Sequence, residues 1–281
     1  MGNWGSSSSP GKYSAARDIV NYYKLDGADL KGKIVVVTGG NAGIGLETVK
    51  CLAEAGATVV MCSRSREKAQ KAIDSEIKNN GLGGYKVSDV SKIIVMELDL
   101  ESLESVARFA KELEATVDKI DYLILNAGIM ACPYRLTAHG FESQMGTNYF
   151  GHYHLVDLLW KRMKQQKHAT RIVELSSIAH TFGKVVVDDI NFTNGRTYDP
   201  WRAYGQSKLA NILHIHALRD LAQKEAPHIK CFSVHPGVIS TGLTQNMSFL
   251  GTIAYYFYSD KNVPQGASTT VYACLSPSLE D

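Results

Sequence analysis

The stretch that decides the fold is Lys33-Ile-Val-Val-Val-Thr-Gly-Gly-Asn-Ala-Gly-Ile-Gly45. Its run from Ile34 to Val37 is apolar and β-branched, as expected for a strand buried on both faces of a parallel sheet. Glycines follow the strand at once, and an amphipathic helix then begins. The stretch therefore predicts a strand, a tight loop and a helix, in that order.

Each glycine of the loop has a separate role. Gly39 permits the tight turn, Gly43 lets the backbone approach a pyrophosphate, and Gly45 lets the helix and the strand pack closely. The helix N-terminus adds free N–H groups and the positive end of a dipole. With Asn41 and Ile44, these glycines are predicted to bind the phosphates of a dinucleotide. The alternative is a glycine-rich turn that holds no ligand.

Downstream of the loop, strands and helices alternate. The predicted strands are 34–37, 58–61, 93–98, 122–125, 171–175 and 230–234, and the predicted helices are 14–24, 65–79, 101–114, one from about 147, and 203–222. Such alternation is typical of a doubly wound, Rossmann-type α/β domain, with a parallel sheet flanked by helices on both faces. We expect this single domain to span 31–281, after a flexible extension with a short helix over 1–30.

Tyr204-Gly-Gln-Ser-Lys208 is the second informative stretch. Positions i and i+4 share one face of a helix, roughly 5–6 Å apart. A lysine ammonium beside a phenol favours the phenolate and lowers the tyrosine pKa from about 10. Tyr204 is therefore a candidate to exchange a proton with a substrate oxygen, assisted by Lys208.

The end of the second predicted strand bears on the cofactor. NAD enzymes usually place an acidic residue about 20 residues past the glycines to bind the ribose 2′-hydroxyl. Here Arg64 lies at that position, in Cys62-Ser63-Arg64-Ser65-Arg66, and no acid is present. A guanidinium suits a 2′-phosphate, so NADP(H) is predicted. Alternatively, the arginines only solvate the start of a helix.

The pattern T-G-x-x-x-G-x-G at Thr38 to Gly45 resembles that of the short-chain dehydrogenase/reductase superfamily. Further short motifs occur in the order that the superfamily has them: Asp99-Leu100, Asn126-Ala-Gly128, Gly146-Thr-Asn-Tyr-Phe-Gly-His152, Ser176-Ser177 and His235-Pro-Gly-Val-Ile-Ser-Thr241. The resemblance spans about 32–275. Asn126-Ala-Gly-Ile-Met-Ala-Cys-Pro133, Arg202-Ala-Tyr-Gly-Gln-Ser-Lys-Leu209 and Val263-Pro-Gln-Gly-Ala-Ser-Thr-Thr270 resemble the retinol-dehydrogenase-like branch, which includes WW-domain oxidoreductases.

The resemblance implies roles for individual residues. Asn148 would hold a water in a proton relay, and Ser177 would polarise the substrate oxygen, with Ser176 as the fallback. The separation from Ser177 to Tyr204 is 27 residues (204 − 177), longer than is usual in the superfamily. By the same resemblance, further residues border the cofactor: Asp99 and Leu100 at the adenine, Asn126, Ala127 and Gly128 beside the sheet, and Pro236, Gly237, Val238 and Thr241 at the nicotinamide.

The activity so implied is hydride transfer between NADP(H) and an apolar substrate that is a carbonyl or an alcohol. The aromatic and aliphatic segment 243–262 is predicted to be a substrate lid, although a packed helix, a dimer contact or a membrane-surface patch would have a similar composition. An NADP(H)-binding scaffold or redox sensor with a protein partner is the alternative function. The resemblance also implies a homo-oligomer and a seventh strand, for which the sequence after Leu275 offers no candidate.

Composition excludes several other classes. A net charge of +2 provides no broad basic surface for nucleic acid. The five cysteines lack C-x-x-C spacing, which indicates a cytoplasmic or other reducing compartment. Histidine pairs spaced i, i+2 cannot share a metal, so no metal site is predicted. Gly2 and Ser6 match the N-myristoylation pattern, which would support a peripheral membrane contact, but a plain disordered start is the alternative.

Overall fold

A computed structural model describes residues 9–23, 30–78, 87–239 and 261–279. Its centre is a parallel sheet in the order β3-β2-β1-β4-β5-β6. The strands are β1 (Ile34–Thr38), β2 (Thr58–Ser63), β3 (Ile93–Glu97), β4 (Tyr122–Leu125), β5 (Thr170–Leu175) and β6 (Ile229–Val234). The strand order changes direction between β1 and β4, and in open α/β sheets ligands bind in the crevice at such a point.

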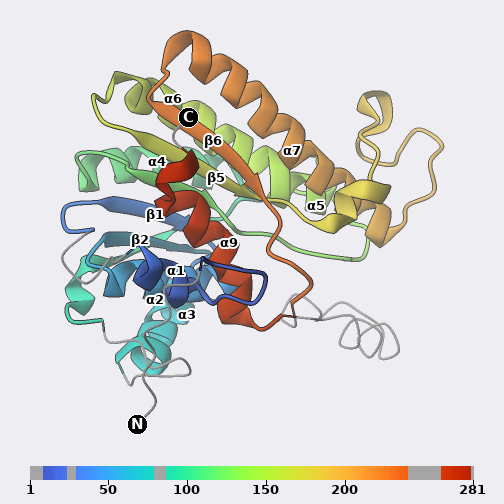
Figure 1. Cartoon of the computed structure of the whole chain (residues 1–281). Helices are drawn as coiled ribbons and strands as arrows, with labels where there is room; N and C mark the ends of the chain where they lie inside the picture. Colours follow the sequence, from blue (N-terminus) through green and yellow to red (C-terminus); the bar gives the residue numbers. More distant parts are fainter. Residues whose placement is uncertain (1–8, 24–29, 79–86, 240–260, 280–281) are drawn as a thin grey trace.

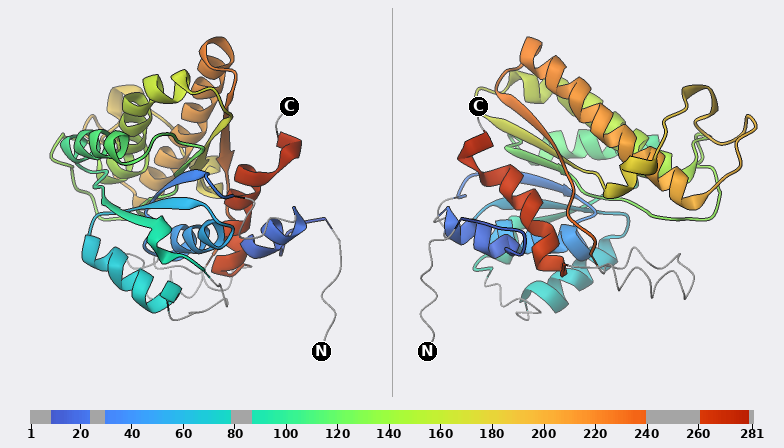
Figure 2. Two further views of the ribbon diagram at one scale, coloured as in Figure 1. Left: turned by 90° about the vertical axis from the view of Figure 1, so that its left-hand side faces the viewer. Right: turned by 45° about the vertical axis from the view of Figure 1, so that its right-hand side comes forward.

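Helices cover both faces of the sheet (Figure 1). One layer contains α1 (Ala16–Tyr22), α2 (Gly43–Glu54), α3 (Arg66–Ala72) and α9 (Val263–Leu275), and the other contains α4 (Leu103–Thr116), α6 (Gly151–Gln165) and α7 (Pro200–Glu225). Each layer buries its own apolar cluster against the sheet. Figure 2 shows the two layers from the side. The predicted doubly wound fold is therefore confirmed.

The central strand and the longest helix form where their residues favour them. Val35, Val36 and Val37 of β1 are fully buried, because β2 and β4 flank the strand and helices cover both faces. Helix α7 begins before the predicted 203, because the Asp199 side chain accepts a hydrogen bond from the Arg202 N–H at 2.7 Å and Pro200 occupies the first turn. Near its start this helix carries the predicted proton donor, Tyr204.

Two predicted helices differ in detail from the observed ones. The helix predicted over 65–79 is α3 followed by a π-helical turn, η1 (Ile73–Lys78). The helix predicted from about 147 begins earlier as α5 (Ser143–Met145), because Glu142 caps it, and a π-helical turn, η3 (Gly146–Phe150), joins it to α6. Short 3₁₀ turns complete the described secondary structure: η2 (Val90–Lys92), η4 (Ile178–Phe182), η5 (Val187–Asp189) and η7 (Pro277–Leu279).

Some predictions concern parts of the chain outside the described residues. These are the Gly2 pattern, Thr241, and the lid segment up to 260. Within the described residues β6 is an edge strand, and no strand beyond it is present. In the same part of the chain no helix has the length and apolar character to cross a membrane.

Candidate functional site

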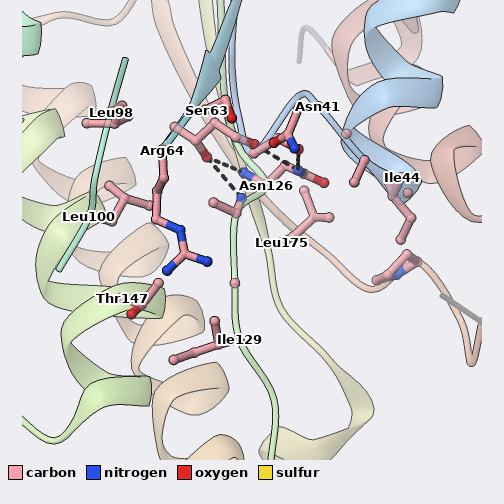
Figure 3. Close-up of a pocket in the computed structure, with 18 of the residues that line it drawn as sticks. Asn41, Ile44, Ser63, Arg64, Leu98, Leu100, Asn126, Ile129, Thr147 and Leu175 are labelled. Atoms are coloured by element: carbon pink, nitrogen blue, oxygen red, sulfur yellow. Dashed lines mark hydrogen bonds between the residues drawn. The ribbon is translucent and has the colours of Figure 1, made fainter. Parts of the chain in front are cut away.

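A cavity of about 340 Å³ opens at the carboxyl ends of the strands, where the strand order changes direction (Figure 3). Its lining consists of Thr38, Gly39, Asn41, Ala42, Gly43, Ile44, Gly45, Ser63, Arg64, Leu98, Leu100, Asn126, Ala127, Gly128, Ile129, Thr147, Leu175, Ser176, Tyr204, Lys208 and Pro236. The structure thus brings together the glycine loop, Arg64, the Asn126 segment and the Tyr204–Lys208 pair, which lie far apart in the sequence.

Because its glycines carry no side chains, the loop can turn tightly and still leave room for a ligand. Gly39 and Gly43 have φ angles of +64° and +53°, in the left-handed region that favours glycine. A Cβ at Gly45 would lie 2.2 Å from the Gly39 carbonyl oxygen and 2.4 Å from the Asn126 amide nitrogen. Helix α2 starts here without a side-chain cap at Ala42, so its first N–H groups point toward the cavity. This cradle fits a pyrophosphate.

Thr38 and Asn126 join the ends of β1 and β4. The Thr38 hydroxyl oxygen accepts hydrogen bonds from the Asn126 and Ala127 N–H groups at 2.9 and 3.0 Å. The Asn126 side-chain amide donates in return to the carbonyl oxygens of Thr38 at 2.8 Å and of Gly39 at 3.3 Å. Asn126 therefore holds the first glycine of the loop against the neighbouring strand.

Asn148 and His152 extend this network into the helical layer. The Asn148 side chain accepts from the Ile129 N–H at 2.8 Å and donates to the Ile129 carbonyl and to Ser207 Oγ, both at 2.9 Å. His152 joins the Asn148 carbonyl, 3.0 Å from its Nδ1, to Thr38 Oγ1, 2.8 Å from its Nε2. Burial lowers the pKa of His152 to about 3, so its imidazole is neutral. Asn148 does not line the cavity, and its side chain instead positions the segment after β4.

Tyr204 and Lys208 lie on the face of α7 that borders the cavity. Tyr204 is 7% exposed, and the Lys208 Nζ is 5.8 Å from the centre of its ring. The Lys208 Nζ also donates to the Leu175 carbonyl at 2.8 Å. Burial lowers the pKa of the Lys208 ammonium to about 8, although the nearby Glu174 carboxylate opposes that change. The Lys208 ammonium thus lies beside the Tyr204 ring at the wall of the cavity.

The two serines after β5 differ in what they contact. Ser176 lines the cavity, but its hydroxyl donates to the Lys208 carbonyl at 2.8 Å. Ser177 lies just outside the lining, and its Oγ accepts from the Ala179 N–H at 3.2 Å, which leaves its hydroxyl hydrogen for another acceptor. Turn η4 after Ser177 packs on α7 so closely that a Cβ at Gly205 would be 2.6 Å from the Ala179 carbonyl oxygen.

Arg64 extends from the end of β2 along the cavity toward Thr147 (Figure 3). Its side chain is 62% exposed, and its only described ionic contact is a long one, 3.7 Å to Glu101. Glu101 has stronger partners, because Arg135 donates two hydrogen bonds of 2.6 Å to it and thereby lowers the pKa of its carboxyl. The Arg64 guanidinium therefore remains available to an anion.

Some predicted residues do not line the cavity, and some lining residues were not predicted. Asp99, Asn148, Ser177, Gly237 and Val238 lie outside the lining, while Thr38, Ala42, Ser63, Leu98, Ile129, Thr147 and Leu175 belong to it. Most of the additional residues lie at or just after the carboxyl end of a strand, which is the signal that could have identified them. Among the described residues, no three His, Cys, Asp or Glu side chains are grouped so that they could hold a metal ion.

Comparisons with known proteins point to one family. A family model described as short chain dehydrogenase matches residues 33–249. Short-chain dehydrogenase TIC 32 A, chloroplastic, from Brassica napus is 37% identical over 282 residues, which cover 96% of this chain and 83% of that protein. Retinol dehydrogenase 12 from Mus musculus is 39% identical over 254 residues, which cover 89% of this chain and 76% of that protein.

Solved structures are similar as well. The crystal structure of an uncharacterised protein from Mycobacterium paratuberculosis has a TM-score of 0.67 and 37% identity, and the match covers 89% of this chain and 80% of that one. RhlG from Pseudomonas aeruginosa, in a complex with NADP, has a TM-score of 0.67 at 21% identity, covering 89% and 92% of the two chains. A Burkholderia phymatum short-chain dehydrogenase/reductase in complex with NAD has a TM-score of 0.66 at 18% identity, covering 87% and 86%. The last two are similar in fold alone.

Proposed function

The chain belongs to the short-chain dehydrogenase family, and from that premise we propose that it is an NADP(H)-dependent oxidoreductase that interconverts a carbonyl and an alcohol on an apolar substrate. The observation that carries the proposal is the arrangement of Tyr204 and Lys208 along one wall of a cavity whose other end is the glycine loop. A proton donor and a dinucleotide cradle in one cavity suit hydride transfer coupled to proton transfer.

The residues of this chain divide the work. When bound, the nicotinamide ring supplies or accepts the hydride. Tyr204 moves the proton to or from the substrate oxygen, and the Lys208 ammonium stabilises its phenolate. Ser177 donates its remaining hydroxyl hydrogen to the substrate oxygen. Asn148 fixes the segment after β4 through Ile129, and so maintains the wall that faces Tyr204.

Arg64 supports NADP(H) over NAD(H). It projects into the cavity from the end of β2, and the described residues that line the cavity include no acidic side chain to bind a ribose 2′-hydroxyl. Solved relatives in fold bind either cofactor, so the choice depends on side chains and not on the fold. A guanidinium with one long ionic contact can form charge-assisted hydrogen bonds to a 2′-phosphate.

The surroundings of Tyr204 support an apolar substrate. Met130, Ala131 and Ala179 form a buried apolar cluster with Tyr204, and Trp201 packs against it. The Trp201 and Tyr204 rings meet edge to face, with centroids 6.4 Å apart. These residues back Tyr204 and do not line the cavity, but they make its surroundings apolar, as is usual at sites that bind apolar molecules and use a few polar groups for orientation. Retinoid, steroid and lipid aldehydes or ketones are the substrate classes to try first.

The decisive test combines binding with turnover. Fluorescence titrations with NADPH and NADH should show tighter binding of NADPH, and a screen of apolar aldehydes and ketones with NADPH should then reveal reduction. Tyr204→Phe should lower the turnover at least about 100-fold, because general acid catalysis contributes that much, while NADPH still binds. Turnover by Tyr204→Phe at the unmodified rate would refute the proposed mechanism. A cellular role that persists in that variant would instead favour a scaffold or sensor.

A further inference from the structure

Three consecutive residues at the end of β5, namely Glu174, Leu175 and the following Ser176, contact helix α7 at Lys208 and beyond it. The Glu174 carboxylate accepts from His214 Nδ1 at 2.9 Å. The Leu175 carbonyl accepts from the Lys208 Nζ at 2.8 Å and from the Asn211 amide at 3.1 Å. The Ser176 hydroxyl donates to the Lys208 carbonyl at 2.8 Å. The part of α7 that carries Lys208 is therefore fastened to one strand at three successive points.

Leu175 and Ser176 satisfy polar groups of α7 by hydrogen bonds. The Glu174–His214 pair differs, because burying it costs free energy. The side chains of Glu174 and His214 are 0% and 3% exposed. Among the described residues, Glu174 Oε1, His214 Nε2 and Asn211 Oδ1 have no hydrogen-bond partner. Apolar side chains of similar size are often as stable as a buried ion pair, or more so. Stability alone therefore does not account for a glutamate and a histidine at these positions.

We infer that Glu174, held by His214, is a positioning residue that keeps the Lys208 ammonium charged and directed at the cavity. This role rests on the proposed function, in which that ammonium acts on Tyr204. Glu174 immediately precedes the residue whose carbonyl holds the Lys208 Nζ. Its negative charge opposes the effect of burial on the pKa of Lys208, and Lys208 in turn opposes the rise that burial causes in the pKa of Glu174.

Titratable groups of several neighbouring elements surround the Glu174–His214 pair. Tyr149 of η3 and Tyr153 of α6 have rings 5.8 and 5.4 Å from the His214 ring. Burial raises the pKa of Tyr149 and of Cys231 in β6, and the charge of Glu174 raises both pKa values further. Burial lowers the pKa of His152 in α6, and the charge of Lys208 lowers it further. Within this group the carboxylate of Glu174 and the ammonium of Lys208 are the complementary charges.

The direct test measures the charge of Lys208 without turnover. The protein is labelled at the lysine ¹³Cε positions, the Lys208 signal is assigned by its loss in Lys208→Met, and its chemical shift is followed against pH. Glu174→Gln removes the charge at nearly constant volume, so the midpoint of Lys208 should fall by about one pH unit. Glu225→Gln is the matched control, because Glu225 lies on the same helix but is exposed and pairs with Lys164. An unmoved midpoint in Glu174→Gln overturns the inference.

A second variant and a kinetic profile guard against misreading. His214→Phe removes the donor that holds Glu174 and should lower the same midpoint, even if Glu174→Gln folds poorly. In carbonyl reduction with NADPH, the loss of rate at high pH should begin at lower pH in Glu174→Gln, because removing an anion eases proton loss from the Tyr204–Lys208 pair as a whole. If the unmodified protein reduces no carbonyl, the proposed function fails, and the ¹³C titration still decides whether Glu174 controls the charge of Lys208.

Discussion

Acid should destabilise this protein through one buried imidazole, that of His152. The Thr38 hydroxyl oxygen already accepts hydrogen bonds from two backbone N–H groups, so the hydroxyl donates its own hydrogen, and His152 Nε2 at 2.8 Å is a nearer acceptor than the Ile124 carbonyl at 3.4 Å. The other ring nitrogen, Nδ1, then donates to the Asn148 carbonyl. A proton on Nε2 would face a hydroxyl that has no further lone pair to offer. The hydrogen bonds and the burial thus both favour the neutral ring.

The size of the effect follows from the difference between the two pKa values. His152 has a pKa of about 3 in the folded protein, against the ordinary histidine value of 6.5. As the pH falls below 6.5 the unfolded chain gains a proton that the folded chain does not, so stability is lost progressively until the pH nears 3. Each pH unit costs about 1.4 kcal/mol, so the loss between neutral pH and about pH 4.5 is about 2–3 kcal/mol.

The assay is urea unfolding at a series of pH values from about 7.5 to 4.5, with the free energy of unfolding extrapolated to water. Carboxylates also titrate in this range, so the comparison is with His152→Gln, which keeps an acceptor for Thr38 but cannot gain a proton. The unmodified protein should lose about 2–3 kcal/mol more than the variant over this range. His154→Gln, on the same helix but less buried, should keep the steep dependence. Equal slopes for the unmodified protein and His152→Gln would refute the reasoning.

Three further predictions concern the loop, the cofactor and the serines. Gly45→Ala should cost at least about 2 kcal/mol in a denaturant titration, because its Cβ would overlap the Gly39 carbonyl, whereas Gly11→Ala has open space and should cost almost nothing. Arg64→Leu should weaken NADPH binding about 10- to 100-fold in a fluorescence titration and leave NADH binding nearly unchanged; an equal loss for both cofactors would exclude a contact to the 2′-phosphate. Ser177→Ala should lower turnover with little change in melting temperature, while Ser176→Ala should lower the melting temperature as well, since its hydroxyl is bonded to Lys208; the opposite result would exchange their roles.

Local patterns predicted the elements whose signals are local. The apolar run of β1, the glycine loop after it and the Tyr204–Lys208 pair each span only a few residues, and the structure has them on the predicted strand, loop and helix. The start of α7 could also have been predicted, because Asp199 followed by Pro200 is a common way to begin a helix.

Contacts between distant segments could not be predicted in this way. Thr38 and His152 are 114 residues apart, and nothing in the spacing of His152 and His154 indicated a buried bridge to the glycine strand. The two π-helical turns likewise depend on packing, because the residues of Gly146–Phe150 and Ile73–Lys78 would also fit an ordinary α-helix. The long contact of Arg64 with Glu101 depends on the position of Arg135, which competes for the same carboxylate.

The π-helical turn at Gly146–Phe150 changes the direction in which side chains point before and after it on one continuous helix. An α-helix advances about 100° per residue, and a π turn accommodates one extra residue, so the faces before and after it are set independently. Asn148 can therefore face Ile129 and Ser207 while Leu155 and Leu159 of α6 pack into the core. Deleting one residue of this turn would restore a regular helix and rotate one face away from its partners.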